Sequence, residues 1–171
     1  MMKLVQNALS PLTPVVFGLC FLGCPGAGEG EGEGEEDPVF EACEHMVDGP
    51  DVDVTATLVL AGSPDVSDPH TRYDVVLVDD QGGAKVGSVA FGAAEATDHT
   101  VFLNADIPIA FFDGAGAPFE IEESITDVAQ CTEVKAGHTV EFPVGTVEIR
   151  LGPTAESSVS LVIEAGAHDH E

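Results

Sequence analysis

Apolar and polar residues alternate with a period of two along most of the chain after residue 50. Val52, Val54 and Ala56 share one face of the first such segment, and Asp53 and Thr55 lie on the other. This alternation predicts half-buried β-strands. The predicted strands are 52–60, 73–78, 85–91, 100–104, 107–112, 119–122, 139–142, 147–151 and 159–164. Short strands separated by Gly, Pro, Asn and Asp are typical of an antiparallel sandwich or barrel.

The connections between these segments refine the predicted topology. Helical spacing is not evident, and residues 123–129 have room for one short helical turn. Residues 152–156 form the loop of a hairpin that joins the last two strands. Cys43 and Cys131 would tie the first strand to a later one. In this respect the all-β domain, residues 39–165, resembles an antiparallel immunoglobulin-like β-sandwich with one disulfide, although the chain has no tryptophan.

The start of the chain has a different composition from the rest. Lys3 precedes an apolar run at residues 12–22, which is too short to cross a bilayer. The sequence Phe21-Leu22-Gly23-Cys24 resembles the lipobox of bacterial lipoproteins. This resemblance implies that residues 1–23 are a signal peptide and that Cys24 receives a diacylglycerol. The alternatives are ordinary cleavage, which leaves Cys24 as a free thiol, and a plain membrane anchor.

The next segment predicts how the domain is held at the membrane. Residues 24–38 are rich in Gly and Glu, so we expect a disordered acidic tether. The domain at 39–165 follows, and a histidine-containing tail at 166–171 ends the sequence. The lipoprotein resemblance implies a lipid anchor in the cell envelope. Pro25 replaces the aspartate that retains many lipoproteins at the inner membrane, which favours the outer membrane, on its periplasmic or surface side.

The charge of the chain limits its partners. It has 31 acidic and 5 basic residues, for a formal net charge of -26. Such a field repels nucleic acids and anionic lipid surfaces, and it attracts cations and basic envelope proteins. Solubility alone is the competing explanation, because the acidic residues are spread along the whole domain.

The cysteines predict a disulfide bond. Of the four cysteines, Cys20 leaves with the signal peptide and Cys24 takes the lipid, so Cys43 and Cys131 remain. Two thiols in an exported domain normally pair. The alternative is a thiolate metal site, because Cys43-Glu44-His45-Met46 places three soft ligands close together.

Histidines provide candidate metal ligands. His168 and His170 lie in the tail Ala-His-Asp-His-Glu, where both side chains of an extended chain point the same way. Short histidine-rich tracts of this kind resemble those of extracytoplasmic proteins that handle zinc or copper. We therefore predict binding of a divalent metal, zinc, copper or nickel, by His168 and His170 with His45.

Two other metal sites are open alternatives. If the strands run up and down in order, His70, His99 and His138 form a three-histidine rim at one pole. Aspartates at 48–53 and at 79–80 offer oxygen ligands for calcium, although their spacing does not match an EF-hand loop.

Catalytic motifs are missing from the sequence. It has no G-x-S-x-G nucleophile elbow, no phosphate-binding glycine loop and no H-E-x-x-H pair. We therefore expect a non-catalytic binding module, held at the membrane and binding or handling a divalent metal. The alternative is a structural or protein-interaction lipoprotein of the envelope with no metal role.

Overall fold

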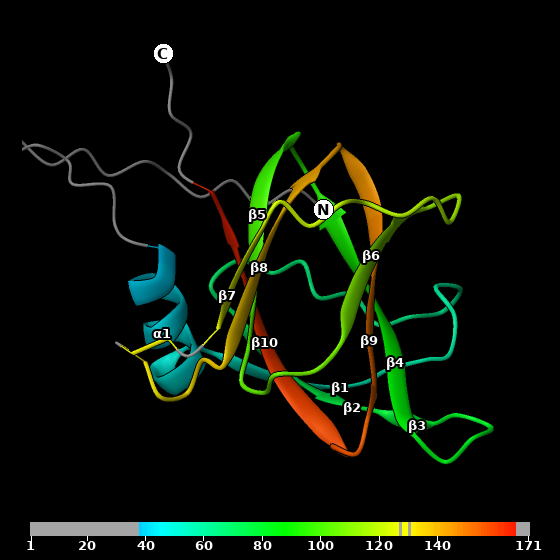
Figure 1. Cartoon of the computed structure of the whole chain (residues 1–171). Helices are drawn as coiled ribbons and strands as arrows, with labels where there is room; N and C mark the ends of the chain where they lie inside the picture. Colours follow the sequence, from blue (N-terminus) through cyan, green and yellow to red (C-terminus); the bar gives the residue numbers. More distant parts are fainter. Residues whose placement is uncertain (1–37, 127, 130, 167–171) are drawn as a thin grey trace, which may run out of the picture. The chain divides into compact units, whose positions relative to one another are not determined.

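The strands of the protein form two sheets that share one apolar core (Figure 1). The computed structural model describes residues 38–126, 128–129 and 131–166. Sheet A has the strand order β1-β2-β10-β5-β8-β7, and sheet B has the order β3-β4-β9-β6. The elements are α1 (Pro38–Asp48), β1 (Asp51–Thr55), β2 (Arg72–Val76), β3 (Val78–Asp79), β4 (Lys85–Ala93), β5 (Thr97–Leu103), β6 (Ile109–Asp113), β7 (Glu123–Thr126), β8 (Ala136–Phe142), β9 (Gly145–Thr154) and β10 (Ser158–Ala165).

This architecture confirms the predicted all-β class. Within the described part of the chain, the named strand pairs are antiparallel except for β1 with β2, which run parallel. The predicted signal peptide, Cys24 and the predicted tether through residue 37 lie outside the described residues.

The main core forms where the inner faces of the two sheets meet. Sheet B contributes Val89 and Ile149, and sheet A contributes Val101, Leu161 and Phe142, all essentially inaccessible to solvent. Alternate residues of each strand point inward because successive side chains of a strand lie on opposite faces. The period-two pattern therefore identifies the buried positions of these strands correctly.

Helix α1 covers the outer face of sheet A, where no helix was expected (Figure 1). Pro38 is its first residue, a position that proline favours because the amide there has no helical partner. Ala42 and Met46, four residues apart, are buried in a second apolar cluster with Val162 of β10. The helix ends at Gly49, whose amide donates to the carbonyl of His45 (3.1 Å).

The Cys43–Cys131 disulfide is confirmed, but the elements that it joins differ from the prediction. Its cysteines are 88 residues apart in sequence and 5.7 Å apart at their Cα atoms. Cys43 lies in α1 and Cys131 lies in the connection from β7 to β8, so the bond fixes a helix on sheet A instead of joining two strands. Because both sulfurs are in the bond, the thiolate metal site is excluded.

The last two strands do not form a hairpin. Strand β9 pairs with β4 and β6 in sheet B, whereas β10 lies between β2 and β5 in sheet A. Residues 155–157 therefore carry the chain from one sheet to the other. The alternation of apolar and polar residues does not reveal to which sheet a strand belongs, because both strands present one apolar face to the same core.

Three shorter segments also differ from their predictions. Residues 123–126 form β7, an edge strand paired with β8, where a helical turn was expected. Residues 119–122 precede that strand and are not part of it. The first strand ends at Thr55, and Leu58 beyond it is exposed to solvent.

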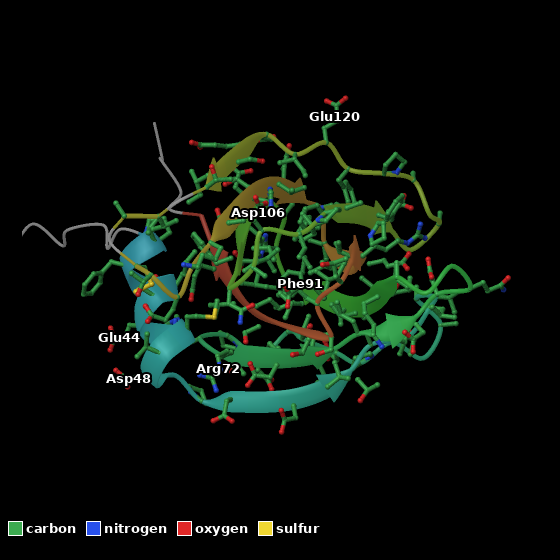
Figure 2. All side chains as sticks on the ribbon, turned by 60° about the horizontal axis from the view of Figure 1, so that its bottom comes forward. Glu44, Asp48, Arg72, Phe91, Asp106 and Glu120 are labelled. Atoms are coloured by element: carbon green, nitrogen blue, oxygen red, sulfur yellow. A yellow bond between two sulfur atoms is a disulfide. The ribbon has the colours of Figure 1, made fainter. Side chains whose placement is uncertain are left out.

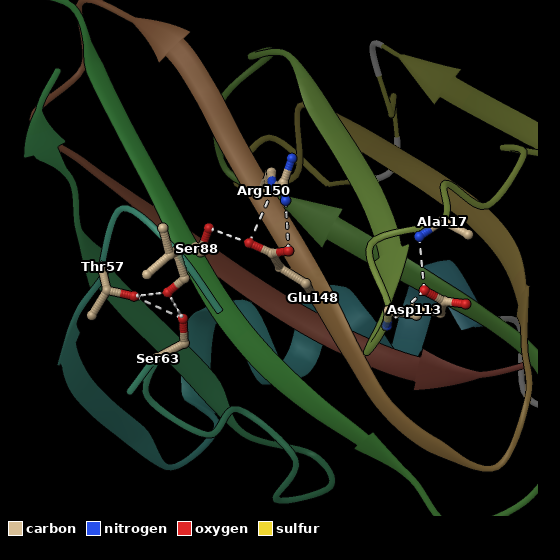
Figure 3. Close-up of polar contacts among 9 residues, drawn as sticks. Thr57, Ser63, Ser88, Asp113, Ala117, Glu148 and Arg150 are labelled. Carbon is tan, nitrogen blue, oxygen red and sulfur yellow. Dashed lines mark hydrogen bonds and ion pairs between the residues drawn. The ribbon is translucent and has the colours of Figure 1, made fainter. Parts of the chain in front are cut away.

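The outer face of sheet B carries a buried carboxylate with a complete set of partners (Figure 3). Arg150 donates from Nε to Oε1 of Glu148 (3.0 Å) and from Nη2 to Oε2 (2.8 Å), and the Ser88 hydroxyl donates to Oε1 (2.7 Å). The Arg150 guanidinium also lies 3.9 Å from the ring centroid of Phe112. These hydrogen bonds, first those from Arg150, lower the pKa of Glu148 although burial opposes them.

Candidate metal centre

Three potential metal ligands from distant parts of the sequence meet beside the C-terminal end of α1. His45 lies in the last turn of the helix, His70 lies two residues before β2, and Glu164 is the penultimate residue of β10. Val162 faces α1 on the outer side of sheet A, and Glu164, two residues later, lies on the same side. The helix and the sheet thus bring an imidazole over a carboxylate.

The polar atoms of this His45–His70–Glu164 cluster are close together. His45 Nδ1 lies 2.7 Å from Oε1 of Glu164, and His70 Nδ1 lies 3.6 Å from Oε2. The two imidazole rings have centroids 4.7 Å apart and are inclined at 54°. One ligand atom from each residue lies within 4.8 Å of the others. The two imidazoles therefore lie near different oxygens of the same carboxylate.

Burial increases toward the carboxylate. The side chain of Glu164 is 5% exposed, that of His45 is 19% exposed and that of His70 is 58% exposed. A buried carboxylate is costly unless cations or strong hydrogen-bond donors compensate it. Among the described residues, the ion-pair partners of Glu164 are these two histidines. Its compensation among the described residues therefore depends on two imidazoles.

Local structure fixes the two histidines in place. A side chain at Gly49 would put its Cβ 2.5 Å from the His45 carbonyl oxygen, so glycine is required directly after Asp48, where the helix that carries His45 ends. Arg72 at the start of β2 donates from Nη1 to the Met46 carbonyl (3.1 Å) and connects the helix end to sheet A; Figure 2 labels Arg72 near Asp48 at the end of α1. His70 has a positive φ of 55°, which is uncommon for a residue other than glycine.

The geometry and the donor set suit a borderline transition metal. Ligand atoms around a tetrahedral zinc ion are roughly 3.3 Å apart, given bond lengths of about 2.0–2.1 Å. The 2.7 Å and 3.6 Å separations lie on either side of that value. Two imidazoles with one carboxylate form a set that zinc, copper and nickel accept. Small adjustments of the three side chains would therefore create a three-donor site.

Of the predicted metal ligands, His45 lies in this cluster, and His168 and His170 lie outside the described residues. His70 and Glu164 were not assigned to a site with His45. No sequence signal distinguishes Glu164, because alternating glutamates on outer strand faces are common and only the packing of α1 buries this one.

The predicted three-histidine rim does not form. His70 contacts His45, whereas His99 lies in the core with its ring 5.0 Å from that of Phe91. His138 is near a different edge of sheet A, where its Nδ1 is 2.9 Å from the Ser124 hydroxyl, and burial lowers its pKa. The rim was predicted on the assumption that successive strands run up and down in order. Because the chain passes between two sheets, that assumption does not hold.

The aspartate loops have structural roles. Asp80 Oδ1 accepts hydrogen bonds from the amides of Gly82 and Ala84, and Asp79 pairs with Lys85. Neither these aspartates nor those at 48–53 belong to a group of three close ligands in the part of the chain that the structure describes. The aspartates at 79–80 thus build a turn.

Comparison with known proteins adds no further constraint. No protein-family model matches the sequence, and no curated protein matches it. Within the described ranges, the helix present is too short to span a membrane.

Proposed function

We propose that this protein is a non-catalytic, lipid-anchored module of the cell envelope that binds a divalent transition metal. His45, His70 and Glu164 would hold the ion, with zinc or copper as the expected metal. The observation that carries the proposal is the buried Glu164 carboxylate, whose described ion-pair partners are two imidazoles. A bound cation would compensate the negative charge of this buried carboxylate.

The strong negative charge of the chain supports this function. A net charge of -26 attracts cations and raises their concentration near the surface. The tail imidazoles of His168 and His170 follow the last described residue, Gly166, by two and four positions. They are therefore candidates for additional donors at the same ion.

The lipoprotein part of the proposal rests on the leader and on the cysteines. The lipobox-like sequence ending at Cys24 provides the attachment point, and the acidic segment after it would serve as a tether to the outer membrane. The Cys43–Cys131 disulfide supports an oxidising compartment outside the cytoplasm. We expect Cys24→Ser to release the protein from membranes and to remove the lipid mass. Retention at the membrane with unchanged mass would contradict the lipid anchor.

We also propose that the domain is an immunoglobulin-like sandwich. Two mostly antiparallel sheets with a common core and one disulfide support this assignment. A departure from the usual pattern is that the disulfide lies outside that core, in the cluster beneath α1. Structural superposition of an experimental structure on immunoglobulin domains would test whether strand order and connections agree.

Calorimetric titration with zinc and with copper tests the metal function. We expect saturable binding by the mature protein, and at least about a tenfold weaker affinity for His70→Ala and for Glu164→Gln. Glu164→Gln keeps the shape of the side chain but removes its charge and replaces one acceptor oxygen by an NH2 donor. Glu120→Gln, which changes an exposed glutamate, is the matched control and should bind as the unmodified protein does.

Two further results would decide between sites. A variant that ends at Gly166 lacks both tail histidines, and a partial loss of affinity in it would assign them a supporting role. Complete loss with the tail and no effect of His70→Ala would move the site to the tail alone. Absence of binding for both metals would reject the metal function and would favour a structural or protein-interaction role.

A further inference from the structure

The three ligands of the proposed centre differ in their exposure to solvent. Glu164, at 5% exposure, forms the floor, and His70, at 58% exposure, forms the outer edge. His45 lies between them in burial and comes from the end of α1. The direction from Glu164 toward His70 therefore leads from the protein interior to solvent.

Three protein donors do not complete the coordination of a transition metal. Structural zinc sites are usually closed by four protein ligands, whereas sites at which the ion reacts or exchanges have three and leave a position for water or another ligand. Among the described residues, the group around Glu164 contains three possible ligands. The remaining position would face solvent beside His70.

The charge of the protein selects what can enter that position. The field of a protein with a net charge of -26 opposes the approach of an anion such as azide or a carboxylate over longer distances, although the ion and Glu164 together carry a local charge of about +1. A neutral nitrogen donor meets no such barrier, and imidazole is a preferred ligand of zinc, copper and nickel. The negative charge of the protein and the ligand preference of the metal therefore both favour an imidazole donor.

We infer that the metal held by His45, His70 and Glu164 keeps one outward coordination position that takes a neutral imidazole donor. This inference rests on the proposed metal function. An incoming imidazole can come from another molecule or from the tail of the chain itself. A site of this kind exchanges its ion by ligand substitution, which suits a protein that accepts and hands over a metal.

Cobalt(II) is a suitable probe because its visible absorption reports the number and type of ligands. The mature protein and the variant ending at Gly166 are each loaded with cobalt and titrated with imidazole, and separately with azide. We expect a saturable spectral change with imidazole and a much weaker response to azide. His70→Ala should give a different starting spectrum, because it removes one of the three donors.

The possible outcomes separate the two proposals. A response of the mature protein supports an outside donor, and a response only after removal of the tail shows that a tail imidazole already fills the position. If both proteins bind cobalt and neither responds, the site is closed and the inference is wrong while the metal function stands. An equal response to azide would overturn the preference for a neutral donor. If cobalt does not bind, the metal function itself fails.

Discussion

Glu148 and Glu164 are both buried glutamates on the outer faces of their sheets, yet their partners differ in kind. Glu148 receives two hydrogen bonds from the permanently charged Arg150 and one from Ser88. Glu164 has imidazole partners, of which one lies at 2.7 Å and the other at 3.6 Å. Burial alone therefore does not mark a functional carboxylate.

Under the proposed metal function, the difference explains why Glu164 and not Glu148 would hold the ion. At Glu148, a cation would have to displace the Arg150 guanidinium, which donates one hydrogen bond to each carboxylate oxygen. At Glu164, the two imidazoles already direct their Nδ1 atoms at the carboxylate, so the proposed metal would be held by these atoms without displacing a side chain. The two oxygens of Glu148 are thus occupied by Arg150, whereas the proposed ion would bind at Glu164.

The largest expected effect concerns the disulfide that holds α1, and with it His45, near Glu164. Replacing Cys43 and Cys131 together by alanine should lower the free energy of unfolding by about 4 kcal/mol, because the bond closes a long loop in the unfolded chain. Denaturant unfolding measures this loss. Amide hydrogen exchange should show faster opening of α1 with little change in β9, which carries Glu148. Equal loss of protection in both elements would show that the two regions are not independent.

The next effect tests the pairing of Glu148. Arg150→Ala leaves a buried carboxylate without its cation and should cost about 3 kcal/mol of unfolding free energy. His70→Ala, the corresponding change at Glu164, should cost less than about 1 kcal/mol without metal, since His70 is more than half exposed. Denaturant unfolding of both variants measures the contrast.

A double variant controls for the loss of packing by Arg150 on Phe112. Combining Arg150→Ala with Glu148→Gln should recover part of the lost stability, because the uncompensated charge is then removed. No recovery would mean that the arginine acts through packing rather than through the carboxylate.

The third effect is the response to zinc. At a free zinc concentration about 100 times the dissociation constant, binding to the folded state should add about 2.7 kcal/mol to the free energy of unfolding. Glu164→Gln should lose most of this gain. Glu148→Gln should lower the starting stability and keep the gain. Thermal unfolding with zinc and with a chelator measures both, and a gain that survives Glu164→Gln would locate the ion elsewhere.

The sequence predicted the fold to the level of its class and its disulfide. Period-two alternation identified core positions such as Ile149 and Leu161, because the rule depends on strand geometry alone. It could not assign strands to sheets, since β9 and β10 look alike from their sequences. The helix was missed although Pro38 and Gly49 mark its ends, and Ala42 and Met46 are spaced by one helical turn.

The candidate site was less predictable than the fold. His45 was predicted to bind a metal with the tail histidines His168 and His170, but its partners in the described structure lie 25 and 119 positions away in the sequence. Glu164 becomes buried only because the disulfide-bonded helix packs over β10, so its environment is a tertiary property. A short-range motif search cannot detect a site assembled in this way.

The smallest expected effect is the acid dependence of stability contributed by Glu148. Its hydrogen bonds from Arg150 lower its pKa in the folded state, so the unfolded state binds more protons in acid. The stabilisation is present above the ordinary glutamate pKa and is lost as the pH falls through the lowered value. Glu148→Gln should therefore make the decline of unfolding free energy in this window shallower by less than about one proton, measured by urea unfolding at a series of pH values. Glu141→Gln, at an exposed position of β8, is the control and should keep the slope of the unmodified protein. An unchanged slope in Glu148→Gln would mean that the Arg150 contact does not favour the ionised carboxylate, and the contrast with Glu164 would then rest on geometry alone.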